Sequence, residues 1–127
     1  MIYHVLVVDD NDMNLTLISK ILTMEGYDVT VACNGDEAIQ SIREKRPDIA
    51  ILDIMMPDMD GFELCRKMRE EPINATMPIV MLTAMNSPTE RKLAKEAGAN
   101  DVWSKPFDMD LFLKRIGKLL KRSTKPF

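Results

Sequence analysis

Cysteine is scarce in this sequence, with only Cys33 and Cys65 among 127 residues. The two thiols lack the paired spacing of a zinc site, and two cysteines are too few for a disulfide framework. We therefore expect both thiols to be reduced, as is usual in the cytoplasm, where we place the protein.

Long apolar runs are also missing. No stretch approaches the roughly 20 apolar residues that a membrane-spanning helix needs, and the N-terminus has no signal-peptide pattern. The chain has no excess of positive charge either, because its formal net charge is -3. That balance argues against direct nucleic-acid binding. We expect partners that are neither membranes nor nucleic acids.

The residues that are present suit one globular domain. Hydrophobic residues make up 46% of the chain and charged residues 29%, which is enough for a packed core. Strand-like and helix-like segments alternate, which predicts an α/β domain with helices on both faces of a parallel sheet. We expect strands over 3–8, 27–32, 48–53, 78–82 and 100–103, and helices over 12–25, 35–45, 61–70, 88–97 and 108–121. Residues 1–121 are assigned to this domain and residues 122–127 to a tail or the start of a linker.

The strands differ in their apolar pattern. The first, third and fourth are continuously apolar, as expected when both faces are covered. In the second strand Tyr27, Val29 and Val31 alternate with polar residues, and the fifth strand is short, so both suit the edges of a sheet. The strand order 2-1-3-4-5 satisfies these patterns and predicts a flavodoxin-like (βα)5 doubly wound sandwich.

The expected helices have start signals and apolar stripes. Asn34, Asp60 and Ser87 are each followed three residues later by glutamate, which predicts three N-caps. The eleven methionines are interpreted as core filler. The stripes predicted to face the core are Leu15, Leu17, Ile18, Ile21, Leu22 and Met24 in one helix, and Phe112, Leu113, Ile116, Leu119 and Leu120 in another.

Polar residues stand at the ends of four strands. Asp9 and Asp10 follow the first strand, Asp53 ends the third, and Thr83 and Lys105 follow the fourth and fifth. The carboxyl ends of parallel strands form one binding edge, so these side chains should converge. Three carboxylates in one crevice disfavour each other's ionisation, which predicts a hard divalent cation, with Mg²⁺ as the first choice. A lysine and a hydroxyl beside that cation suit a phosphoryl group.

Each of these residues can be given a chemical role. Asp53 would act as a nucleophile toward phosphorus. Asp9 and Asp10 would hold the cation, which would neutralise charge on the transferred group. Lys105 would pair with phosphoryl oxygens as a point charge. Thr83 would donate a hydrogen bond only once the group is attached, as a switch requires.

Four segments of the chain resemble the receiver domains of two-component response regulators. They are Val5-Leu6-Val7-Val8-Asp9-Asp10, the loop from Asp53 to Gly61, Leu82-Thr83-Ala84 and Lys105-Pro106-Phe107. The resemblance implies a receiver rather than an enzyme, phosphorylated on Asp53 by a sensor histidine kinase or a phosphotransfer protein. It also implies an effector domain or a downstream protein as the output partner, and a switch in the face formed by the fourth and fifth helices and the fifth strand.

The resemblance also implies details of the site. Asp10, Asp53 and the backbone carbonyl of Met55 would ligate Mg²⁺ directly, and Asp9 would act mainly through water. The bond between Lys105 and Pro106 would be a cis peptide, which proline permits.

Three side chains modify this expectation. Trp103 stands where the family usually has a tyrosine or phenylalanine that turns inward as Thr83 moves toward the phosphoryl group. Met55 and Met85 stand where side chains of the family face attacking water. Because neither thioether can orient a water molecule, we expect a phosphoryl group that persists.

Other functions remain open. A pseudo-receiver would act by binding, without phosphorylation. A Mg²⁺-dependent aspartate-nucleophile phosphatase has a second aspartate where this chain has Met55. A flavin binder needs a loop of small and hydroxyl residues after the first strand, where Asp9-Asp10-Asn11-Asp12 would repel a phosphate.

His4 opens the first strand at the opposite edge from the carboxylates and is not expected to carry a phosphoryl group.

Overall fold

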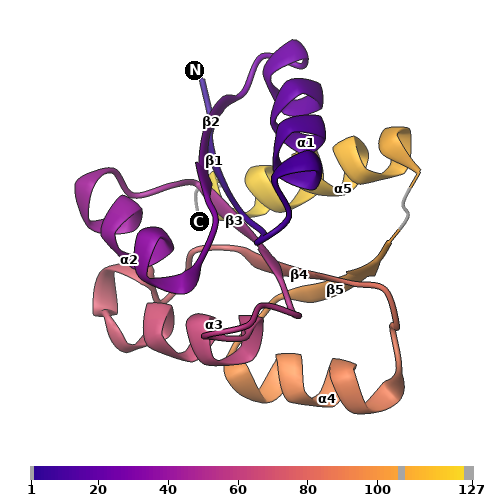
Figure 1. The fold of residues 1–127 in the computed structure, drawn as a ribbon. Helices are drawn as coiled ribbons and strands as arrows, with labels where there is room; N and C mark the ends of the chain where they lie inside the picture. Colours follow the sequence, from indigo (N-terminus) through magenta and orange to yellow (C-terminus); the bar gives the residue numbers. More distant parts are fainter. Residues whose placement is uncertain (1, 106–107, 125–127) are drawn as a thin grey trace.

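The computed structural model describes residues 2–105 and 108–124 (Figure 1). No helix within those residues is both long and apolar enough to cross a membrane. The elements are β1 (His4–Val8), α1 (Asp12–Met24), β2 (Asp28–Ala32), α2 (Gly35–Glu44), β3 (Ile49–Asp53), α3 (Gly61–Glu70), the 3-10 helix η1 (Pro72–Asn74), β4 (Ile79–Thr83), α4 (Pro88–Ala97), β5 (Asp101–Ser104) and α5 (Met109–Thr124).

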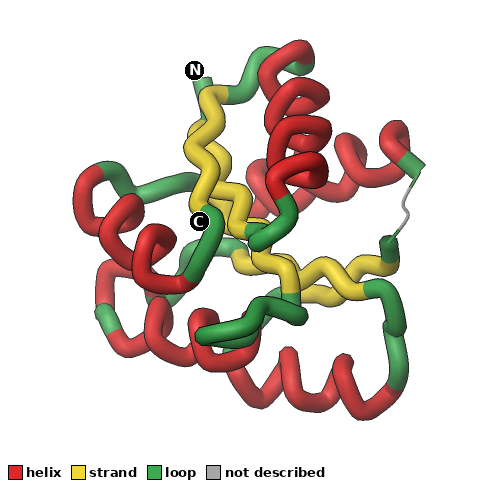
Figure 2. The backbone as a smooth tube through the Cα atoms, in the orientation of Figure 1, coloured by secondary structure: helices red, strands yellow, loops and turns green. Residues whose placement is uncertain are grey.

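The strands form one parallel sheet in the order β2-β1-β3-β4-β5. Helices α1 and α5 pack on one face, and α2, α3 and α4 pack on the other, with the strands between them (Figures 1 and 2). The predicted fold class and strand order are therefore confirmed. The switch point lies between β1 and β3, where the connections on the two sides of the sheet diverge.

Burial follows the apolar pattern of each strand. Every residue of β1, β3 and β4 is buried, whereas β2 and β5 carry exposed residues at the sheet edges. The prediction of two edge strands is confirmed.

The predicted helix caps are also confirmed. The side chains of Asn34, Asp60 and Ser87 each accept the N–H of the glutamate three residues later. The sequence reasoning did not predict η1, which has no periodic pattern because it is a single short turn. Helix α5 continues to Thr124, three residues beyond its predicted end. The boundary between the domain and a tail at residue 121 remains a prediction.

The predicted apolar stripe of α1 was partly wrong. Leu15, Ile18 and Leu22 are buried, but Leu17 is 52% exposed and Met24 is 80% exposed. A helix turns about 100° per residue, so the three buried residues share the face toward the sheet and the other two point away from it. In α5, Phe112, Ile116 and Leu120 are buried, and Leu113 and Leu119 are partly buried against the same core.

The interpretation of methionine as core filler also holds only in part. Buried methionines are Met56, Met68, Met77 and Met81, whereas Met13, Met24, Met55 and Met85 are exposed. Composition cannot separate the two groups, because exposure depends on which face of an element each residue occupies.

Arg69 of α3 joins segments that lie apart in the sequence. Its Nε donates to the Gly98 carbonyl at 3.0 Å, and its Nη1 donates to the carbonyls of Asn74 and Met77 at 2.6 Å each. Its Nη2 donates to Oδ1 of Asn100 at 3.0 Å. One side chain thus connects α3 to η1, to the approach to β4 and to the turn before β5.

Candidate functional site

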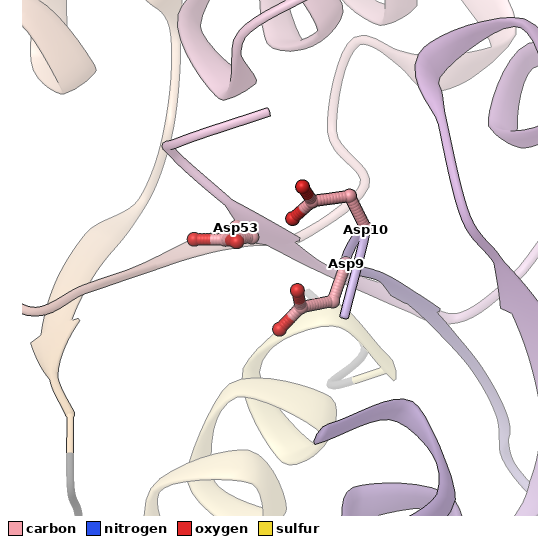
Figure 3. A group of neighbouring side chains, drawn as sticks. All are labelled: Asp9, Asp10 and Asp53. Atoms are coloured by element: carbon pink, nitrogen blue, oxygen red, sulfur yellow. The ribbon is translucent and has the colours of Figure 1, made fainter. Parts of the chain in front are cut away.

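Three carboxylates meet at the carboxyl ends of β1 and β3. Asp53 is the last residue of β3, and Asp9 and Asp10 directly follow β1, which pairs with β3. Their nearest carboxylate oxygens all lie within 4.8 Å of one another (Figure 3). Asp9 and Asp53 are buried and Asp10 is exposed, so the cluster opens to solvent on one side. The predicted convergence of these residues is confirmed.

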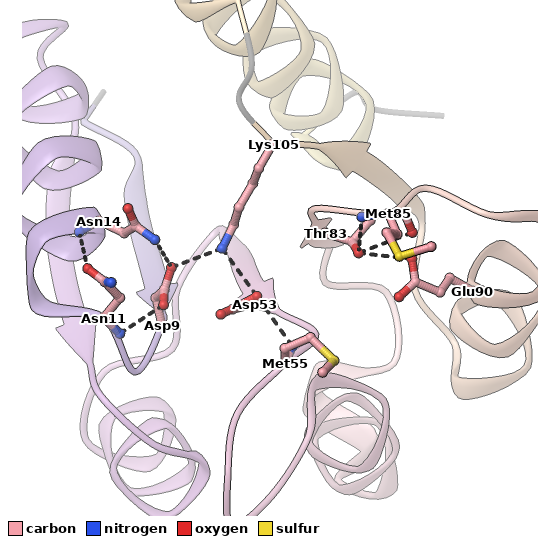
Figure 4. A network of polar contacts seen from close by, with 9 residues as sticks. All are labelled: Asp9, Asn11, Asn14, Asp53, Met55, Thr83, Met85, Glu90 and Lys105. Carbon is pink, nitrogen blue, oxygen red and sulfur yellow. Dashed lines mark hydrogen bonds and ion pairs between the residues drawn. The ribbon is translucent and has the colours of Figure 1, made fainter.

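Asp9 is held in place by the start of α1. Its Oδ1 accepts the Asn11 N–H at 2.9 Å, and its Oδ2 accepts from Nδ2 of Asn14 at 3.2 Å (Figure 4). Asn11 also caps the helix by accepting the Asn14 N–H. Sequence reasoning did not assign these two asparagines to the site. Their signal was the Asn-x-x-Asn spacing at the first turn of a helix.

Lys105 links two of the carboxylates. Its Nζ lies 3.2 Å from Oδ2 of Asp9 and 3.2 Å from Oδ1 of Asp53 (Figure 4). The cluster therefore contains three carboxylates and one ammonium group, and its net charge is negative. Oxygen-rich clusters with excess negative charge and solvent access suit a hard divalent cation, so these residues fit Mg²⁺.

The pKa of Asp53 reflects its burial first and the neighbouring negative charge second. Burial and the negative charge of Asp9 raise the pKa of Asp53 to about 6, while Lys105 opposes the shift. The raised value means that the fold disfavours the ionised form of this carboxyl group.

We expect Asp53→Asn to stabilise the Mg²⁺-free protein at pH 7.5. A carboxyl whose pKa is raised in the folded state contributes stability below its ordinary pKa, and that contribution is lost as the pH rises through about 6. After allowance for solvent screening, the variant should have a free energy of unfolding about 1–2 kcal/mol higher at pH 7.5. The difference should vanish near pH 4, which urea denaturation at both pH values would measure.

The control for this comparison is Asp58→Asn, which neutralises an exposed carboxylate of the same loop. Its free energy of unfolding should equal that of the wild type at both pH values. Equal stabilities of wild type and Asp53→Asn at pH 7.5 would contradict the electrostatic account.

The start of α3 packs closely against the backbone of Asp53 and Ile54. The Gly61 N–H donates to the Ile54 carbonyl at 2.9 Å. A Cβ atom at position 61 would lie 2.6 Å from the Asp53 carbonyl oxygen and 2.9 Å from the Ile54 Cα. Glycine therefore permits an approach between helix and loop that no other residue allows.

Thr83 lies at the end of β4, on the strand next to β3. Its buried hydroxyl donates to Oε1 of Glu90 at 2.9 Å and accepts the Met85 N–H at 3.1 Å. Figure 4 shows these contacts directed away from Asp53. Glu90 was predicted only to help start a helix, and its contact with Thr83 has no signal in the sequence.

Trp103 lies on β5 with 3% of its surface exposed. Its Nε1 donates to Oδ2 of Asp101 at 2.9 Å, and its ring meets Phe112 edge to face at 5.6 Å between centroids. The Arg115 guanidinium lies 5.7 Å from the ring centroid. The indole is thus enclosed by β5 and α5, and its predicted role as a switch remains a prediction.

Met55 lies beside Asp53 and Met85 lies beside Thr83, and the two side chains are 71% and 72% exposed (Figure 4). The Met55 N–H donates to Oδ1 of Asp53 at 3.3 Å. Ligation of a cation by the Met55 carbonyl remains a prediction, and the predicted cis peptide at Pro106 lies outside the described residues.

His4 does not belong to this cluster. It begins β1, whereas the carboxylates follow the end of that strand. Its ring nitrogens lie 3.1 Å from Oδ2 of Asp28 and 3.0 Å from Oγ1 of Thr30. The imidazole thus has hydrogen-bond partners on β2 and lies apart from the carboxylate cluster.

Comparison with known proteins gives consistent matches. The family model of the response regulator receiver domain matches residues 5–117. The chain is 38% identical over 118 residues to response regulator PleD of Caulobacter vibrioides, an alignment that covers 93% of this chain and 26% of PleD. It is also 38% identical over 119 residues to the alkaline phosphatase synthesis transcriptional regulatory protein PhoP of Bacillus subtilis, covering 94% of this chain and 49% of PhoP.

Solved structures agree with these relatives. The chemotaxis protein CheY4 of Vibrio cholerae matches with a TM-score of 0.91 and 34% identity, over 94% of this chain and 99% of CheY4. The present chain spans about a quarter of PleD and about half of PhoP. The family match runs from β1 into α5 and includes the acidic cluster and Lys105. The chain therefore belongs to the response regulator receiver domain family of two-component signalling.

Proposed function

We propose that this receiver domain accepts a phosphoryl group on Asp53 from a histidine kinase or a phosphotransfer protein. The observation that carries the proposal is the contact of Asp53 with Lys105 inside a cluster that holds two further carboxylates. The carboxylate oxygen would attack phosphorus, and the bond from phosphorus to the donor's leaving atom would break. An acyl phosphate on Asp53 and a dephosphorylated donor would result.

Mg²⁺ is the cofactor of the proposed reaction. Asp10, Asp53 and the Met55 carbonyl would hold the cation, with Asp9 acting through water. When bound, Mg²⁺ would neutralise charge on the transferring group. Lys105, which bridges Asp9 and Asp53 in the resting protein, would pair with an oxygen of the transferred phosphoryl group.

The output would pass through the face formed by α4, β5 and α5. Thr83 ends the strand beside Asp53, and Trp103 lies on the next strand, so a movement of Thr83 has a short route to this face. An effector domain or a separate protein would read that change. PleD and PhoP extend well beyond the matched region, and this extra length supports an output partner of this kind.

The competing phosphatase proposal has less support. That chemistry needs an acidic group two residues after the nucleophile, to protonate the leaving group and activate water. Here the position holds Met55, whose thioether cannot transfer a proton. We therefore propose a signalling module rather than an enzyme.

The proposed phosphorylation is tested by intact mass after incubation with Mg²⁺ and acetyl phosphate. We expect one added phosphoryl group on the wild type, one on the control Asp58→Ala, and none on Asp53→Ala. An adduct that persists on Asp53→Ala would contradict the assignment. If no protein gains mass, beryllofluoride with Mg²⁺ distinguishes the causes: a change in Trp103 fluorescence means that the site binds a phosphoryl mimic, and no change means a pseudo-receiver.

We expect the phosphoryl group to be lost slowly, because Met55 and Met85 cannot orient an attacking water molecule. Met55→Gln introduces a polar amide at an exposed position and should speed dephosphorylation by roughly tenfold. Loss of the added mass over time, after removal of acetyl phosphate, measures the rate. The matched variant Met55→Leu keeps the side chain apolar and should retain the wild-type rate. An unchanged rate in Met55→Gln would refute the explanation.

A further inference from the structure

Thr83 carries one hydroxyl proton, and in the resting structure the hydroxyl already donates it in a hydrogen bond. The hydroxyl lies 2.9 Å from Oε1 of Glu90 and 3.2 Å from the Met85 carbonyl, and it accepts the Met85 N–H. The shorter bond, to a carboxylate, is the stronger one because it is charge-assisted. Thr83 is 1% exposed, so water does not compete for this proton.

Glu90 lies in the first turn of α4, three residues after the cap Ser87. A glutamate at this position commonly closes a capping box by accepting the backbone N–H of the cap residue. Here the Ser87 N–H donates to the Met85 carbonyl instead, at 2.9 Å. The Glu90 carboxylate reaches Thr83, so the start of α4 is tied to the end of β4 (Figure 4).

We propose that Glu90 is a positioning residue that holds the Thr83 hydroxyl away from Asp53 and thereby sets how strongly the domain responds to phosphorylation. The inference rests on the proposed function, in which Thr83 donates to a phosphoryl oxygen. One proton cannot serve both acceptors, so the phosphorylated state must break the bond to Glu90. Breaking it also releases the first turn of α4, which couples the site to the output face.

The energetic consequence has a characteristic sign. A bond present only in the resting state stabilises that state and opposes the switch by the same free energy. Removing Glu90 should therefore lower the stability of the resting protein and tighten the binding of a phosphoryl mimic. A residue that acts only as a helix cap would lower stability without changing the binding of the mimic.

The test is a double-mutant cycle with Glu90→Ala and Thr83→Val, which deletes the hydroxyl and keeps the side-chain shape. Urea denaturation without Mg²⁺ measures the resting bond and needs no phosphoryl chemistry. Titration with beryllofluoride at fixed Mg²⁺ measures the switch. Glu96→Ala removes an exposed carboxylate from the same helix and is the control for charge and helix propensity.

We expect Glu90→Ala to lower the dissociation constant for beryllofluoride by about three- to tenfold. In the Thr83→Val background, Glu90→Ala should change the dissociation constant less than twofold. This comparison separates two effects of Glu90→Ala: loss of the bond to Thr83, and loss of a negative charge near the bound anion. Glu96→Ala should leave the dissociation constant within twofold of the wild type. Urea denaturation should show that Glu90→Ala destabilises the wild type more than it destabilises Thr83→Val.

Two results would overturn the proposal. One is an equal effect of Glu90→Ala on beryllofluoride binding in both Thr83 backgrounds. The other is additive effects on stability, which would mean that the two side chains do not interact in the resting protein. If no variant binds beryllofluoride, the proposed phosphorylation fails, and the stability cycle still decides whether Glu90 holds Thr83.

Discussion

Replacing Gly61 with alanine should lower the free energy of unfolding by about 2–3 kcal/mol and slow phosphorylation of Asp53 by at least about tenfold. The added methyl group would lie 2.6 Å from the Asp53 carbonyl oxygen and 2.9 Å from the Ile54 Cα. Both are backbone atoms that cannot turn aside, so α3 and the loop after β3 must separate. Because Asp53 belongs to that backbone, its carboxylate shifts relative to Asp9 and Lys105.

Gly117→Ala provides the matched control. Gly117 lies within α5, and a Cβ atom there meets nothing within 4 Å. The same chemical change should raise stability by up to about 1 kcal/mol, because alanine favours a helix over glycine. Urea denaturation and the rate of mass gain with acetyl phosphate measure both variants. Wild-type stability in Gly61→Ala would show that the helix start can move without strain.

We expect Arg69→Met to lower the free energy of unfolding by about 3 kcal/mol. The change keeps an unbranched apolar stem but removes the guanidinium, and with it the hydrogen bonds to Gly98, Asn74, Met77 and Asn100. Partial burial lowers the pKa of the Arg69 guanidinium, which means that burying its charge costs free energy. Arg69→Met removes this cost, which offsets part of the lost stabilisation. Urea denaturation at neutral pH measures the result.

Arg66→Met is the control for this prediction. Arg66 is exposed on the same helix, and its replacement should change stability by less than about 0.5 kcal/mol. Arg69→Lys should recover only part of the loss, because an ammonium group cannot reproduce the planar fork of a guanidinium. If Arg69→Met is as stable as Arg66→Met, the hydrogen bonds of Arg69 add nothing to the stability of the fold.

Most of the fold could be predicted because its rules act over short stretches of chain. Continuous apolar runs such as residues 49–52 mark strands buried on both faces, and the alternation in β2 marks an edge. N-caps such as Asn34 and Asp60 satisfy helix N–H groups within three residues. The α1 stripe failed at Leu17 and Met24 because apolar character alone does not say which side of a helix meets the sheet.

The sequence by itself determined the strand order and the meeting of Asp9, Asp10, Asp53 and Lys105, because parallel strands bring their carboxyl ends to one edge wherever they lie in the chain. Only the tertiary structure decided which partners the polar side chains take outside the helix caps. The bridge from Lys105 to two carboxylates, the bonds of Arg69 and the contact of Thr83 with Glu90 depend on rotamers and on packing between separate elements. Such contacts leave no periodic pattern in the sequence, because each joins residues whose spacing along the chain is arbitrary.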